Sequence, residues 1–198
     1  MKLFLILLAL VPASLFAVLP NNILAPIESD PQQISGLEFS VVTQSDWVHS
    51  GHKSSQETIV LQLRVTNRTD KEILFPTFDS FRFILKGADG KALPATGGRD
   101  ATRITPNILL QPKASYSLPI KATLQRQNDG KGLAFVIQDG TGSIEMYAVK
   151  TGDHLLSLNV FPTHYDFEKE GKLTAPLWKG EGTTKNIKVK VKALEHKK

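Results

Sequence analysis

The residues best suited to hold a metal ion are two histidines in one polar segment. His49 and His52 lie three residues apart in SDWVHSGHKSSQ, between two expected strands. Imidazole nitrogens bind zinc and copper, and exposed loops often carry binding groups. A third ligand is not evident nearby, although metal sites in proteins use three or four. We therefore take Trp47, His49 and His52 as a candidate binding loop, with Trp47 as an exposed aromatic, and expect no bound metal or other cofactor.

The other residues with catalytic potential are better explained by turns and solvated segments. Asp129 and Asp139 each precede a glycine, as in turns. Asp166, Glu168 and Glu170 surround a phenylalanine in a polar stretch and do not define a catalytic pair. The sequence contains no cysteine, no Gly-x-Ser-x-Gly segment and no glycine-rich phosphate loop. We therefore do not expect an enzyme.

The first residues, MKLFLILLALVPASLFAVLP, have the order of an export signal. Lys2 precedes an apolar run, and small residues follow at Ala13 and Ala17. The run from Leu3 to Leu19 is 17 residues, at the short end of what spans a bilayer, and it contains a proline. We predict a signal peptide at residues 1–17 and export to the periplasm or beyond, with no stable membrane span once it is removed. An uncleaved anchor is the alternative.

The positive charge of the chain is concentrated at its end. The formal net charge is +5, and residues 185–198 hold six lysines against one acid. In NIKVKVKAL, apolar residues alternate with lysines, which predicts a strand with one buried and one basic face. Exposed lysines on a terminal strand also discourage association between sheet edges. Arginines and interleaved aromatics are missing there, so we expect no binding of nucleic acid.

The same two-residue period recurs through most of the 198 residues. It predicts strands in 37–41, 57–67, 81–86 and 116–120, and a hairpin formed by 144–149 and 154–160. Periodicity does not assign the short apolar run 133–138, which we interpret as a strand. No sustained helical stripe is present. The fold class is therefore all-β, an antiparallel β-sandwich of about eight strands. We expect one domain over 37–198, preceded at 18–36 by a linker or surface arm without regular structure.

Several side chains have structural roles in this interpretation. Trp178 and the phenylalanines of FPTFDSFRF belong to the core. Pro119 inside its strand indicates an edge position. The Asn67-Arg68-Thr69 sequon is better explained as a turn than as a glycosylation site.

The order of these segments resembles bacterial immunoglobulin-like domains, including the intracellular proteinase inhibitor family. IVLQLRVTNRTDKEILFPTFDSFRFILKGADGK is similar to the strand, Val-Thr-Asn turn, phenylalanine strand and Asp-Gly-Lys turn of that family. LLQPKASYSLPI, VKTGDHLLSLNV and LWKGEGTTKNIKVKV are similar to later strands, with Lys113-Ala114, Thr151 and His154 departing from the pattern. The resemblance covers parts of 57–192 and implies an immunoglobulin-like fold.

A fold resemblance does not determine function. The expectation from the export signal and the strand pattern is a non-enzymatic binding module for a protein or a cell-envelope component. The first alternative, implied by the resemblance, is a proteinase inhibitor that presents the loop 94–110. The second is a periplasmic metal-binding protein that uses His49 and His52.

Overall fold

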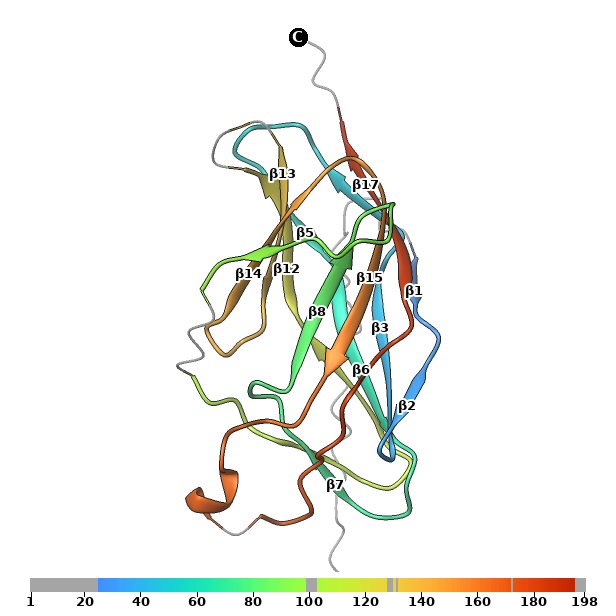
Figure 1. Cartoon of the computed structure of the whole chain (residues 1–198), viewed down its shortest axis with the longest axis vertical. Coiled ribbons are helices and arrows are strands. Elements are labelled where there is room, and N and C mark those ends of the chain that lie inside the picture. Colours follow the sequence, from blue (N-terminus) through green and yellow to red (C-terminus); the bar gives the residue numbers. More distant parts are fainter. Residues whose placement is uncertain (1–24, 99–102, 128–129, 131, 172, 195–198) are drawn as a thin grey trace, which may run out of the picture.

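The regular secondary structure of the described residues is almost entirely β-strand, as the two-residue periodicity predicts. The computed structural model describes residues 25–98, 103–127, 130, 132–171 and 173–194 (Figure 1). Within them one short 3-10 helix, η1 (Phe167–Glu170), accompanies the strands. None of the described residues forms an apolar helix of membrane-spanning length. The predicted signal peptide at 1–17 lies outside the described residues.

Three five-stranded sheets and one two-stranded sheet contain these strands. The β3 sheet consists of β1 (Pro26–Glu28), β2 (Gln32–Ile34), β3 (Leu37–Gln44), β6 (Leu61–Asn67) and β11 (Ser115–Pro119). The β13 sheet consists of β5 (Gln56–Ile59), β9 (Ala95–Thr96), β12 (Lys121–Arg126), β13 (Leu133–Gln138) and β14 (Ile144–Val149). The β15 sheet consists of β4 (Asp46–His49), β8 (Phe81–Lys86), β15 (Gly152–Val160), β16 (Gly182–Thr183) and β17 (Ile187–Ala193). The remaining pair is β7 (Ile73–Phe75) with β10 (Ile108–Leu110), and β4 is parallel to β17.

One bent pair of strands runs through both the β3 sheet and the β13 sheet. Pro119 pairs with Gln62 in the former, and Ala122 pairs with Ile59 in the latter. Between them the N–H of Ile120 donates to a β6 carbonyl at 2.9 Å, so the register continues without a shift. β5 with β6, and β11 with β12, therefore form a single bent ribbon. β3 is added beside its β6 half and β13 beside its β12 half.

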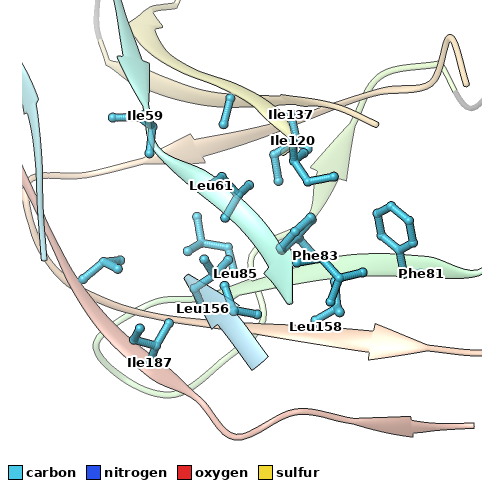
Figure 2. Close-up of a cluster of buried hydrophobic side chains, with 14 of the residues drawn as sticks. Ile59, Leu61, Phe81, Phe83, Leu85, Ile120, Ile137, Leu156, Leu158 and Ile187 are labelled. Carbon is cyan, nitrogen blue, oxygen red and sulfur yellow. The ribbon is translucent and has the colours of Figure 1, made fainter. Parts of the chain in front are cut away.

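The β15 sheet packs against the bent ribbon and encloses one apolar core. Figure 2 shows Ile59 and Leu61 of the ribbon facing Leu85, Leu156 and Ile187 of the β15 sheet. Each of these five side chains is at most 5% exposed. Both layers, the bent ribbon and the β15 sheet, consist of strands in which inward and outward residues alternate. The arrangement is an antiparallel β-sandwich, which confirms the predicted fold class.

Trp178 closes the other end of this core, as expected. Its ring centroid lies 5.1 Å from that of Phe39 and 5.8 Å from that of Phe75. A Cβ atom placed on Gly180 would lie 2.5 Å from the Trp178 ring and 2.7 Å from Ser35. Gly180 is therefore required, because the segment that contains Trp178 and Gly180 packs closely on Ser35, just before β3.

The bend of the ribbon leaves Val60 without a strand partner on one side, and side chains replace that partner. The N–H of Val60 donates to Gln44 Oε1 at 2.8 Å, and its C=O accepts from Thr43 Oγ1 at 2.7 Å. Thr43 Oγ1 in turn accepts from the indole N–H of Trp47 at 3.1 Å. These bonds satisfy main-chain groups that would otherwise be buried unpaired where the ribbon changes sheets.

Three expectations about strands are wrong. Residues 25–36 do not lack structure, because β1 and β2 both pair with β3. The expected hairpin of 144–149 and 154–160 does not form, since β14 pairs in the β13 sheet and β15 crosses to the opposite layer. The final strand has the predicted alternation, but it lies between β15 and β4, so its lysines do not protect a sheet edge.

The predicted turns at Asn67 and Asp139 and the predicted edge strand are confirmed. Asn67 is fully buried, with its amide donating to the carbonyls of Lys71 and Leu110 and its Oδ1 accepting from Thr69, so the sequon is part of a turn. Asp139 accepts from Thr141 in the same way, whereas Asp129 lies outside the described residues. Within the part of the chain that the structure describes, β11, which contains Pro119, pairs with β6 alone.

We predict that Thr43→Val lowers the free energy of unfolding by about 1–3 kcal/mol, because it leaves the Val60 carbonyl and the Trp47 N–H without partners. Urea unfolding at neutral pH measures this. Thr58→Val, an equivalent change at an exposed position of β5, is the matched control. Equal losses in the two variants would show that the bend does not depend on this hydroxyl.

Candidate functional site

Trp47 belongs to the core, so the expectation that it is exposed is wrong. It lies on β4, is 0% exposed, and stacks on Phe135 with a centroid distance of 4.2 Å. β4 continues the β15 sheet beside β17, which turns Trp47 inward. The pairing of β4 with β17 could not be predicted from the residues around Trp47, because the partner strand is more than 140 residues away in sequence.

His49 is buried as well and holds the loop that follows it. Its Nδ1 accepts from the Gly51 N–H at 3.0 Å, and its Nε2 lies 3.2 Å from Ser55 Oγ. Because Nδ1 accepts, the ring proton is on Nε2, which donates to the serine. The carbonyl of His49 accepts from the N–H of Leu194 at 2.9 Å. The histidine therefore fastens the loop 50–55 to the end of β17.

The structure does not bring the two histidines together as a metal site. His52 is exposed on the loop, and its carbonyl accepts from both the N–H and the hydroxyl of Ser55. Both ring nitrogens of His49 already have hydrogen-bond partners. Among the described residues, no group of three or more histidine, aspartate or glutamate side chains could hold a metal ion.

Glu57 completes the support of the loop. Its Oε1 accepts from the N–H of Ser50 at 3.1 Å. Hydrogen bonding by the Ser50 side chain, more than any other cause, lowers the pKa of the Glu57 carboxyl, and burial opposes this effect. The hydroxyls of Ser50 and Ser55 are themselves 2.8 Å apart. The loop 50–55 is thus a fixed structure built on one buried imidazole and one ionised carboxylate.

An open groove lies beside this loop, at the end of the sandwich where β17 ends. Figure 1 shows this end of β17 in its upper part. We call this groove the end groove. It is lined by Gly51, Arg126, Thr151, Gly152, Lys190, Val191, Lys192, Ala193 and Leu194. These residues come from the loop 50–55, the end of β12, the turn between β14 and β15, and the end of β17. Strands from both layers therefore meet there.

Arg126 enters the end groove from the core side and is only partly hydrogen-bonded. It shares a face of β12 with the buried Ala122 and Leu124, so its side chain enters from the inner side of the sheet. Its Nη2 donates to the Gly51 carbonyl at 3.4 Å, a long hydrogen bond. Its Nε is shielded from solvent and has no acceptor among the described residues. A guanidinium at the end of the core thus keeps an unused buried donor.

The described residues that line the groove carry positive charge. They include Arg126, Lys190 and Lys192 and no acidic residue. Lys192 is paired with Asp46 at 2.7 Å on the outer side of the sheet. Leu194, at the rim, is 56% exposed. The groove therefore combines a positive field with an apolar wall, formed by Val191, Ala193 and Leu194.

Gly51 has a backbone conformation that suits its place in the groove. Its φ of 90° lies in the region that side chains disfavour. In this conformation its N–H meets His49 while its C=O meets Arg126. The histidine loop predicted from the sequence does border the groove, but the groups that line the groove are Gly51 and Arg126 rather than Trp47, His49 or His52. The sequence did contain a sign of this role for Arg126, because it occupies the next position on the same strand face as the apolar residues Ala122 and Leu124.

The loop 94–110, which a proteinase inhibitor would present, is held at both described ends. β9 pairs with β14, and the N–H of Arg103 donates to the Thr141 carbonyl at 3.0 Å. The Thr77 hydroxyl contacts Thr105 at 2.7 Å. Residues 99–102 lie outside the described residues, so inhibition stays a prediction.

Comparison of the chain with protein-family models, with curated proteins and with solved structures found no match.

We predict that Glu57→Gln destabilises the protein by about 1 kcal/mol at neutral pH. The folded state lowers the Glu57 pKa, so the carboxylate stabilises the fold above the ordinary pKa of a glutamate. This contribution is lost as the pH falls through the lowered pKa, and the two proteins should then converge. Urea unfolding measured from neutral to acidic pH, with Glu72→Gln at an exposed position as control, tests it. A deficit that persists unchanged in acid would refute the carboxylate's role.

Proposed function

We propose that this chain is an exported, non-catalytic, immunoglobulin-like binding module that holds an anionic group of a protein or cell-envelope component in the end groove. The observation that carries the proposal is Arg126, whose Nε is buried without an acceptor at a groove lined by two further cations. The expected signal peptide supports export. The antiparallel sandwich and the core position of Trp178 support the immunoglobulin-like resemblance.

A buried cationic donor without a partner is unfavourable in the free protein. A polar group removed from water without a hydrogen bond costs free energy, and more so if it is charged. A ligand that supplies an acceptor removes that cost and gains a charge-assisted hydrogen bond. The planar guanidinium matches the two oxygens of a carboxylate or phosphate. Because the Nε is shielded, an anion in the end groove can accept from it once the Arg126 side chain has turned toward the groove.

The groove also suits binding better than proton transfer. Arginine stays protonated in proteins, so Arg126 can hold an anion but cannot act as a general base. Its support by the Gly51 carbonyl and the fixed loop 50–55 gives the guanidinium a defined position. Loops at the ends of sandwiches form binding surfaces in immunoglobulin-like domains. The apolar rim at Leu194 provides contact area for whatever carries the anionic group.

An NMR titration with inorganic phosphate and, separately, with acetate tests this proposal. The shielded Nε–H of Arg126 should give its own resonance, and we expect that resonance to shift on addition of either anion. Arg126→Gln should weaken binding at least about tenfold, since one charge-assisted hydrogen bond and a cation are lost.

The matched control is Arg64→Gln, which removes the same charge from an exposed pair with Glu28 on the β3 sheet. It should leave anion binding unchanged. Arg126→Lys, which keeps the charge but not the planar fork, should bind with intermediate strength. If the Arg126 resonance does not move, or if the Arg126→Gln and wild-type proteins bind the anions equally, the groove is not an anion site.

A further inference from the structure

A second surface is the outer face of the β15 sheet, which shares Lys190 and Lys192 with the end groove. In β8 and β17, and in β15 apart from the fully buried Ser157, buried residues alternate with outward ones, so the outward residues share one face. The basic residues on this face are Arg82, Lys86, Lys188, Lys190 and Lys192, and its acidic residues are Asp46 and Asp153. The face therefore has an excess of positive charge.

Cross-strand register places three of these lysines around one apolar side chain. Leu155 pairs with Lys86 on one side and with Lys188 on the other, so it lies between two cations. Lys190 follows on the same face of β17, about 7 Å along the strand. Leu155 is partly exposed, and Lys188 and Lys190 are exposed. The arrangement is a row of cations with an apolar residue among them.

Neutralisation by neighbouring acids is incomplete. Lys192 is paired with Asp46, and Arg82 contacts Glu145 at 3.4 Å. Asp153 lies opposite Lys190 in the register. No acid faces Lys86 or Lys188 within the described rows of the sheet, where their shared neighbour is Leu155. These two lysines are thus the cations most available to an external partner.

The composition of the face indicates the chemistry of that partner. Protein interfaces favour arginine and aromatic residues and contain few lysines, whereas this face is rich in lysine. Nucleic-acid surfaces combine basic residues with aromatics or a groove. Lysines spread over a flat face instead suit a diffuse anionic surface, where charge matters more than geometry. Their long stems also let the ammonium groups extend beyond an apolar residue such as Leu155.

We propose that the outer face of the β15 sheet docks onto an anionic phospholipid surface, with Lys86 and Lys188 as the principal contacts. This inference goes beyond the end groove, because neither lysine lines that groove. A peripheral protein held in this way would stand on the membrane with the plane of the β15 sheet parallel to it. Attachment would be electrostatic and therefore weakened by salt.

Co-sedimentation with vesicles of phosphatidylglycerol mixed with phosphatidylcholine tests the proposal, with pure phosphatidylcholine vesicles as the neutral reference. We expect binding to the anionic vesicles at low salt, and its loss at high salt. Lys86→Gln with Lys188→Gln should reduce partitioning about 25-fold, since each lysine near an anionic bilayer contributes about fivefold. Binding to neutral vesicles is subtracted from binding to anionic vesicles. This removes the contribution of any apolar leader on the chain, which would bind to both.

The control protein carries Lys71→Gln and Lys121→Gln, which remove the same charge from exposed positions away from the β15 sheet. It should bind anionic vesicles within about twofold of wild type, whereas Lys86→Arg with Lys188→Arg should bind as wild type does. Circular dichroism confirms that each variant is folded. The proposal would be overturned if the protein did not bind anionic vesicles at low salt, or if it bound soluble polyglutamate but not vesicles. It would also be overturned if Lys86→Gln with Lys188→Gln lost no more binding than Lys71→Gln with Lys121→Gln.

Discussion

The bend of one two-stranded ribbon at Val60 determines how the rest of the chain is arranged. The ribbon keeps its register while it passes from one sheet to the other, and Thr43 and Gln44 satisfy the main-chain groups that the bend leaves unpaired. Because those two residues end β3, the chain must turn directly into β4, which lies in the opposite layer. The hydrogen bonds at Val60 thus hold the end of β3 at the bend, and the pairing of β4 with β17 turns Trp47 inward.

The end groove follows from the same geometry. β4 carries His49 to the end of the sandwich, where its ring and carbonyl join the loop 50–55 to the end of β17. The β12 half of the ribbon ends there too, so the next inward position after Leu124 is Arg126. Apolar residues fill the core, and the final position is taken by a cation with an unused donor. An exposed arginine would bind anions weakly, because water competes for its donors, whereas this one is partly shielded.

The alternation of neighbouring residues predicts the strands and turns of this protein. It does not predict which strands pair when the partners are far apart in sequence. The alternation in β17 and β6, the Asn67 turn and the core position of Trp178 depend on neighbouring residues and were predicted correctly. The partners of β4 and of β15 lie in distant segments, whereas β14 pairs with the strand just before it, β13. The turn at Lys150-Thr151-Gly152 can begin a hairpin or, as here, a crossing between layers. For this reason Trp47 was expected outside the core, and the candidate loop was recognised without Arg126.

Amide hydrogen exchange followed residue by residue by NMR tests the bent ribbon most directly. The account predicts slow exchange for the Ile120 amide, bonded to the Leu61 carbonyl, and for the Val60 amide, bonded to the Gln44 side chain. Protection would then continue from β5 into β6 and from β11 into β12 without interruption. Exchange at the rate of an unstructured chain at Val60 and Ile120, with protection on either side, would mean two separate strand pairs and would contradict the account.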